Sequence, residues 1–106
     1  MTKIINSISD ISNKYDFFIL DQWGVMHDGI KGYSHAIKAV NQLIQKDKKL
    51  IIVSNSSRRK INSIDRLNVL GFNKNHFLEI MTSGEMIWQE LFNSSKKYIN
   101  QMRNCF

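Results

Sequence analysis

The sequence predicts an α/β fold built on a parallel sheet. Short apolar runs alternate along the chain with longer segments whose apolar residues recur at helical spacing. Each apolar run ends in a polar cluster that precedes the next helix. Such alternation of strand and helix favours parallel strands joined by right-handed crossovers. The 106 residues leave room for one domain of this kind.

The first predicted elements are a helix, a strand and a second helix. Four isoleucines at helical spacing predict a short amphipathic helix over residues 4–13. Residues 17–20 are apolar throughout, which is typical of a strand buried on both faces between helix layers. Gly24 and Gly29 then bracket a tight excursion, such as a small hairpin or flap. Apolar positions between residues 34 and 45 predict the second helix.

The second half of the chain repeats this order. Residues 50–53 form another apolar run, and residues 61–70 have the apolar spacing of a helix that Gly71 would end. Residues 77–81 predict a third strand.

A fourth helix is expected to begin near Ser83, whose hydroxyl suits the N-cap position. Ile87 and Leu91 supply apolar positions along it. Trp88 and Phe92 lie four residues apart and are expected to belong to the core.

The formal charge of +6 comes from 15 basic and 9 acidic residues and raises the question of nucleic-acid binding. The basic residues are scattered, and only residues 46–49 and 58–60 are dense in charge. Aromatic residues do not interleave with them as in single-strand binders. The charge therefore favours a solvated basic surface over a nucleic-acid site.

The sequence offers no feature that places the chain in or beyond a membrane. No apolar run approaches the roughly 20 residues that span a bilayer. The first ten residues lack the basic segment and apolar core of a secretory signal. Cys105 is the single cysteine and cannot form an internal disulfide. We therefore expect a cytoplasmic protein without a membrane partner.

Asp21, Ser54 and Ser83 are expected to converge at one edge of the sheet. Each lies where a predicted strand ends, and open α/β sheets bind ligands at the carboxyl ends of their strands. A carboxylate at the position of Asp21 suits a phosphoryl-accepting nucleophile, a metal ligand or a local turn. The position alone favours the turn.

Residues 54–57, Ser-Asn-Ser-Ser, precede a helix and suit either an anion such as phosphate or ordinary N-capping. The cations Arg58, Arg59 and Lys60 oppose the dipole of that helix, and an anion nearby would relieve the conflict. A solvated basic face is the simpler interpretation of them. The histidines have no metal-ligand spacing and are expected on the surface or in the flap: His27, His35 and His76. A phosphate loop ending in Gly-Lys-Ser or Gly-Lys-Thr is absent.

Two longer segments carry a family resemblance. Residues 17–25, Phe-Phe-Ile-Leu-Asp-Gln-Trp-Gly-Val, and residues 50–58, Leu-Ile-Ile-Val-Ser-Asn-Ser-Ser-Arg, resemble motifs one and two of the haloacid dehalogenase-like hydrolases. Leu-Gly-Phe at 70–72 and Thr-Ser-Gly-Glu at 82–85 resemble the class IIA branch of that superfamily. A subgroup of the branch shares the pattern Asp-x-Trp-Gly-Val. The resemblance implies an incomplete Rossmann-like three-layer α/β core with a parallel sheet, whose cap domain is largely absent.

The resemblance also implies residue roles. Asp21 would be the catalytic nucleophile, and its second oxygen would bind Mg²⁺. The backbone carbonyl of Trp23 would be another metal ligand. Ser54 would hydrogen-bond a phosphoryl oxygen, and Asn55 would lie beside the substrate. Backbone amides would help to cradle the phosphate, namely those of Gln22, Trp23 and Gly24.

Two departures from the family pattern bear on the chemistry of the site. The family usually has a second aspartate two residues after the nucleophile, as general acid and base, and this chain has Trp23 there. The motif-three lysine and the motif-four acids, which complete the magnesium site, have no counterpart in these residues. Residues 1–95 are therefore expected to be the N-terminal part of the core domain. Residues 96–106 would be the start of a cap, with a first cap strand at 96–99, or an unplaced tail.

The function implied by the resemblance is a magnesium-dependent phosphatase that acts on a small phosphorylated metabolite through an aspartyl-phosphate. We expect this chain to be truncated and inactive alone, as a shortened form of a longer protein, one part of a split gene or the product of a decayed gene. An apolar strand left at the sheet edge would favour self-association. Trp23 in place of the acid–base residue motivates the alternative, a non-catalytic binder of phosphorylated small molecules.

Overall fold

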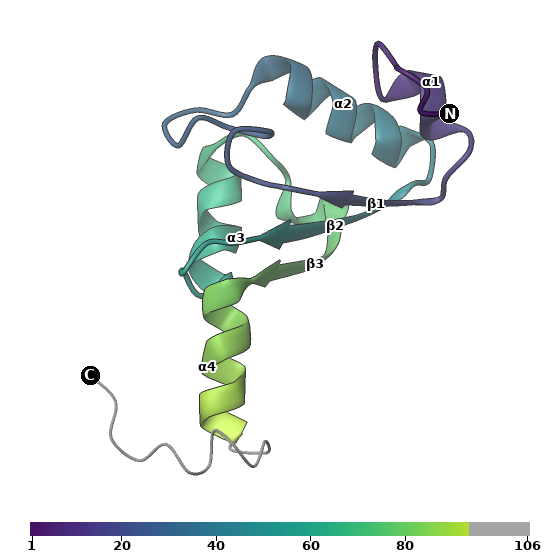
Figure 1. Cartoon of the computed structure of the whole chain (residues 1–106). Helices are drawn as coiled ribbons and strands as arrows, with labels where there is room; N and C mark the ends of the chain where they lie inside the picture. Colours follow the sequence, from purple (N-terminus) through teal and green to yellow (C-terminus); the bar gives the residue numbers. More distant parts are fainter. Residues whose placement is uncertain (94–106) are drawn as a thin grey trace.

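The computed structural model describes residues 1–93, which contain a three-stranded parallel sheet (Figure 1). Strand β1 (Phe17–Leu20) pairs with β2 (Lys49–Ser54), and β2 pairs with β3 (Phe77–Thr82). The strand order is β1-β2-β3, so β1 lies at an edge of the described sheet. The alternation of strands and helices and the parallel pairing predicted from the sequence are confirmed. The predicted boundary after residue 95 and the predicted cap strand lie outside the described residues.

The helices are α1 (Ser9–Ser12), α2 (Ser34–Gln45), α3 (Lys60–Val69), the 3₁₀ turn η1 (Lys74–His76) and α4 (Ser83–Asn93). The first helix is much shorter than the predicted 4–13, because Ile4 is 90% exposed and has no core to pack against. Only Ile8 of that segment packs against the core. A short helix without apolar contacts is marginal in water. Within residues 1–93 we find no helix long and apolar enough to cross a bilayer.

One face of the sheet is covered by α2 and α3. Side chains alternate between faces along a strand, and Leu50 and Ile52 of β2 are completely buried on this side. Leu43 of α2 and Leu67 of α3 belong to the same buried cluster. Each such side chain contributes roughly 1.5–3 kcal/mol when fully buried. This layer therefore fixes the parallel strands and the edge at which they end.

The opposite face of the sheet is open among the described residues. Phe17 and Ile19 of β1 are 57% and 71% exposed, and Val53 of β2 is 49% exposed. The prediction that residues 17–20 are buried on both faces is therefore wrong. An all-apolar strand indicates two covered faces, but residues 1–93 provide a helix layer on only one. The described part of the core is thus an incomplete three-layer arrangement.

Helix α4 continues directly from β3 and extends away from the sheet (Figure 1). Trp88 and Phe92 are 39% and 72% exposed, so the prediction that they belong to the core is wrong. Their rings stack on each other with centroids 4.8 Å apart. The guanidinium of Arg59 lies 3.5 Å from the centroid of the Trp88 ring. The helical spacing of these aromatics was correct, but no core element lies opposite them in the described residues.

The open edge of β1 leads to a prediction about association. We expect the chain to self-associate at micromolar concentration, because β1 presents unpaired backbone groups beside exposed Phe17 and Ile19. Ile19→Lys should shift the population toward monomer. Ile30→Lys, at an exposed position in the flap, is the matched control. Size-exclusion chromatography with light scattering measures both, and a stable monomer at every concentration would contradict the prediction.

Candidate functional site

Asp21 and Ser54 lie at the same carboxyl edge of the sheet. Leu20 pairs with Ile52, Asp21 follows that pair directly, and Ser54 ends β2. The Asp21 carboxylate is exposed, and its Oδ1 accepts a hydrogen bond from the Gln22 N–H at 2.7 Å. Within residues 1–93 nothing donates to the other carboxylate oxygen. The predicted convergence of Asp21 and Ser54 is therefore present, and one carboxylate oxygen of Asp21 accepts no hydrogen bond within residues 1–93. Ser83, the third predicted member, directly follows the last residue of β3.

The chain after Asp21 makes the compact flap that the two glycines predicted. Met26 N–H donates to the Gln22 carbonyl at 2.9 Å, and Gly24 N–H donates to the His27 carbonyl at 2.9 Å. Tyr33 N–H closes the flap onto the Met26 carbonyl at 2.9 Å. Gly24 has φ of +78°, a conformation that favours glycine. The N–H groups of Gln22 and Gly24 are thus already engaged, whereas the Trp23 N–H makes no hydrogen bond within residues 1–93.

His27 is a buried member of the flap. Its Nδ1 accepts a hydrogen bond from Gly29 N–H at 2.9 Å, and the Trp23 ring meets its ring edge-on at 5.5 Å. Burial lowers the pKa of His27, and the Arg66 cation lowers it further. A neutral ring that accepts at Nδ1 carries its proton on Nε2. His27 therefore supports the flap as a neutral hydrogen-bonding group.

A cavity of about 430 Å³ lies beside this edge of the sheet. Four of the six predicted site residues line it: Gln22, Trp23, Ser54 and Asn55. Asp21 and Gly24 do not line it. Ser54 is buried, and its Oγ accepts a hydrogen bond from Ser56 N–H at 3.2 Å, which leaves its own O–H free to donate into the cavity.

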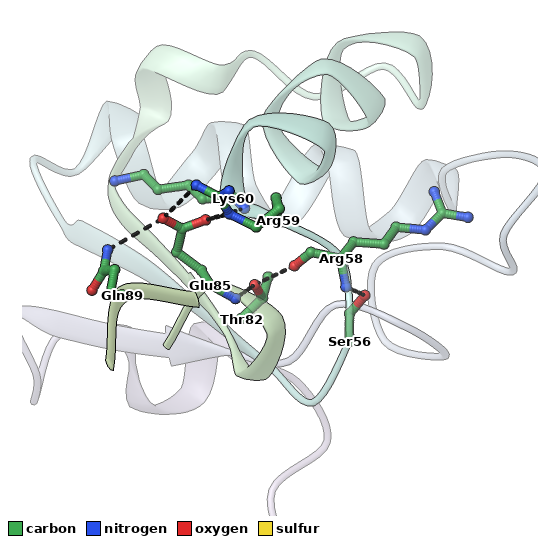
Figure 2. A network of polar contacts seen from close by, with 7 residues as sticks. All are labelled: Ser56, Arg58, Arg59, Lys60, Thr82, Glu85 and Gln89. Carbon is green, nitrogen blue, oxygen red and sulfur yellow. Dashed lines mark hydrogen bonds and ion pairs between the residues drawn. The ribbon is translucent and has the colours of Figure 1, made fainter. Parts of the chain in front are cut away.

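The loop after β2 is clamped by the start of α4 (Figure 2). The Thr82 hydroxyl donates to the Arg58 carbonyl at 2.5 Å, and Gly84 N–H donates to the Ser56 carbonyl at 3.0 Å. Thr82 Oγ1 also accepts from Glu85 N–H at 3.0 Å, so Thr82 rather than Ser83 caps α4. The prediction of Ser83 as the cap placed the helix start correctly but chose the neighbouring hydroxyl.

Glu85 completes this clamp with a buried carboxylate. It accepts from Arg59 Nε at 2.7 Å, from Lys60 N–H at 2.9 Å and from Gln89 Nε2 at 3.3 Å. The hydrogen bond from Arg59 is the main reason that the pKa of Glu85 falls to about 2, and the Lys60 N–H adds to it. Glu85 thus supplies the anion that the cationic first turn of α3 requires. Lys60 also pairs with Glu79 through its side chain.

Comparison with known proteins identifies the family. The family model for haloacid dehalogenase-like hydrolases matches residues 18–103. The chain belongs to the haloacid dehalogenase-like hydrolase family. A hydrolase of this family from Brucella suis 1330 has a similar crystal structure, with a TM-score of 0.68 and 30% sequence identity. The match covers 78% of this chain and 32% of that one, so this chain spans about a third of the length of its structural relative. No curated protein matches.

Membership of the haloacid dehalogenase-like family confirms the resemblance drawn from residues 17–25 and 50–58. Other cavity residues were not singled out as site residues by the sequence, notably His27, Ser63 and Arg66. They reach the cavity from the flap and α3, and no local motif marks them. The Glu85 clamp did have a signal, because Thr-x-x-Glu at 82–85 is a capping-box pattern.

The clamp makes Gly84 sensitive to substitution. A Cβ at Gly84 would lie 2.0 Å from the Ser57 carbonyl oxygen and 2.3 Å from its carbon. Overpacking of this kind costs about 1–3 kcal/mol, while the higher helix propensity of alanine returns at most about 1 kcal/mol. Because the neighbour is backbone, we expect Gly84→Ala to lower the free energy of unfolding by about 1–2 kcal/mol in urea titrations. Ser83→Ala, an exposed neighbour, should stay within about 0.5 kcal/mol, and equal effects of the two would contradict the steric account.

Glu85 also predicts an acid-sensitive stability. The folded pKa of about 2 lies below the ordinary value of 4.5, so this stabilisation is complete above the ordinary value and is lost as pH falls toward 2. We expect the unfolding midpoint to drop across that window. Glu85→Gln should be less stable than the unmodified chain at neutral pH, and its unfolding midpoint should fall less as the pH drops from 4.5 toward 2. Thermal unfolding followed by circular dichroism measures both effects, and Asp65→Asn on α3 is the control. If the unfolding midpoints of Glu85→Gln and of the unmodified chain fall equally with pH, the assignment to Glu85 is refuted.

Proposed function

We propose that this chain carries the phosphoryl-accepting part of a magnesium-dependent phosphatase of the class IIA branch. The observation that carries the proposal is the shared carboxyl edge of Asp21 and Ser54, beside a cavity rich in hydroxyl and guanidinium groups. Family membership makes phosphoryl transfer the leading chemistry for that arrangement. A small phosphorylated metabolite in the cytoplasm is the proposed substrate.

In the proposed step, the open carboxylate oxygen of Asp21 attacks phosphorus and forms an aspartyl-phosphate. The bond between phosphorus and the ester oxygen breaks, and the departing oxygen takes a proton from water. The free O–H of Ser54 donates to one phosphoryl oxygen, and the Trp23 N–H donates to another. Water then attacks the aspartyl-phosphate, which releases phosphate and regenerates the Asp21 carboxylate.

The donor set at this edge suits Mg²⁺ in kind. The ion prefers oxygen ligands, keeps several waters, and is commonly held by one or two carboxylates together with substrate phosphate. Asp21 and the backbone carbonyl of Trp23 would hold it here. Residues 1–93 contain no group of three or more acidic, histidine or cysteine side chains that could complete such a site. Bound there, Mg²⁺ would neutralise phosphoryl charge.

Trp23 limits the expected rate. Its indole cannot accept the proton of the attacking water or protonate the leaving group, and general acid–base help is worth about 10²–10⁴-fold in rate. We therefore expect this chain to turn over slowly by itself. The same residue favours the second candidate, a binder of phosphorylated small molecules, and so does the position of Asp21 outside the cavity lining.

One experiment separates the two candidates. The chain is incubated with Mg²⁺ and a panel of sugar phosphates and nucleotides, and both binding heat and released phosphate are measured. The phosphatase proposal expects slow release that requires Mg²⁺. The binding proposal expects binding heat without release of phosphate. A chain that neither binds nor hydrolyses any member of the panel would refute both.

A further inference from the structure

The lining of the cavity has one sign of charge. Arg58 on the loop after β2 and Arg66 on α3 both line it, and the lining includes no aspartate or glutamate. His27, the remaining titratable side chain in the lining, has a lowered pKa and adds no charge near neutral pH. A cavity whose charged groups are all positive attracts anions and raises their local concentration.

Arg58 has a fixed backbone and an uncommitted side chain. Its carbonyl is held by Thr82, and its N–H donates to Ser56 Oγ at 3.2 Å. Its guanidinium makes no ion pair or hydrogen bond within residues 1–93. In Figure 2 this side chain extends away from Glu85, whereas Arg59 turns toward it. The clamp that neutralises Arg59 therefore leaves Arg58 available to a ligand.

Arg66 is held from the other side of the cavity. Its guanidinium donates to the Gly29 carbonyl of the flap. An arginine has five N–H donors, so this contact orients the group without exhausting it. Arg66 thus joins α3 to the flap and contributes a second fixed positive charge to the cavity.

The two arginines exceed what a phosphoryl group needs in the proposed function. In the proposed function, the phosphoryl group of the substrate lies against the Ser54 hydroxyl and the Trp23 N–H, at the carboxyl edge of the strands. We propose that the substrate carries a second anionic group, a carboxylate or another phosphoryl group, that is bound by Arg58 with Arg66 in support. The planar guanidinium matches both groups because it can donate two parallel hydrogen bonds. The inference rests on the proposed function and names a class of substrate for it.

The test compares two esters that differ in one group. Glycerol 3-phosphate and 3-phosphoglycerate share a terminal phosphate ester, and only 3-phosphoglycerate adds a carboxylate. Calorimetric titration of the chain in Mg²⁺ buffer should give roughly tenfold tighter binding of 3-phosphoglycerate, as one charge-assisted hydrogen-bonded pair supplies. Arg58→Gln should abolish this preference and leave the affinity for glycerol 3-phosphate within about twofold. Lys38→Gln, which removes an exposed charge on α2 outside the lining, should preserve the preference.

Failure of the inference and failure of the proposed function give different results. If the chain binds the two esters with equal affinity, or if Arg58→Gln weakens the binding of both equally, the proposal of a second anionic group is overturned. The phosphate site itself would remain intact. Ser54→Ala should weaken the binding of both esters to the same extent. If Ser54→Ala changes neither while the preference persists, Arg58 binds an anion but the proposed phosphoryl position is wrong. If neither ester binds, both proposals fail.

Discussion

Asp21→Asn is expected to reduce phosphate release from any hydrolysed ester to background, a loss of roughly 10³-fold or more where turnover is measurable. The amide is not a nucleophile toward phosphorus, and Glu85, the carboxylate that follows the end of β3, is already engaged by Arg59 and the Lys60 N–H. The fold should be unaffected, because Asp21 is exposed and an asparagine oxygen can still accept the Gln22 N–H. The unfolding free energy should therefore change by less than about 0.5 kcal/mol.

Asp28→Asn is the matched control for that variant. Asp28 is also exposed in the flap, and its Oδ1 accepts the N–H groups of Ile30 and Lys31 at 2.9 and 2.8 Å, which asparagine can also do. Activity should survive this change. Phosphate release that persists in Asp21→Asn, or that is lost equally in Asp28→Asn, would show that Asp21 is not the attacking group.

Trp23→Asp is expected to have the opposite effect, a gain in phosphate release of about 10²–10⁴-fold, the range of general acid–base help. The substitution places a carboxyl group two residues after the nucleophile. The Trp23 ring is 65% exposed, so little buried apolar surface is lost. Its backbone carbonyl, the proposed metal ligand, is unchanged by the substitution.

Trp23→Asn separates proton transfer from the loss of the ring. Asparagine has the size of aspartate but does not exchange a proton near neutral pH. Both variants uncover Gly29 and His27, which the indole contacts. If the two variants hydrolyse esters at the same rate, the missing acid–base group does not limit this chain.

The positions of the strands and of their ends were predictable because they depend on local patterns. Apolar runs at 17–20, 50–53 and 77–81 fixed three strands, and parallel pairing then brought Asp21 and Ser54 to one edge. Burial was not predictable in the same way. Whether Ile19 or Phe92 is covered depends on which element lies opposite, and periodicity within one strand or helix carries no such information.

The residues that line the cavity were likewise predictable only in part. Ser54 was predicted from its position at the end of a strand, and Gln22, Trp23 and Asn55 were predicted from the family resemblance. Arg66 was missed because it reaches the cavity only through the packing of α3 against the flap. The basic run at 58–60 suggested a single solvated face, whereas the structure divides it. Glu85 engages Arg59 and Lys60, and Arg58 lines the cavity.

The central claim is that Asp21 accepts the phosphoryl group. It is tested most directly by incubating the chain with Mg²⁺ and the ester that it binds most tightly, quenching in acid, and mapping phosphorylated peptides by mass spectrometry. We predict a phosphoryl group on Asp21 in chains that are quenched during turnover, and none in the Asp21→Asn variant. Phosphate release with no phosphoryl group on Asp21, or modification of another residue in its place, would contradict the claim.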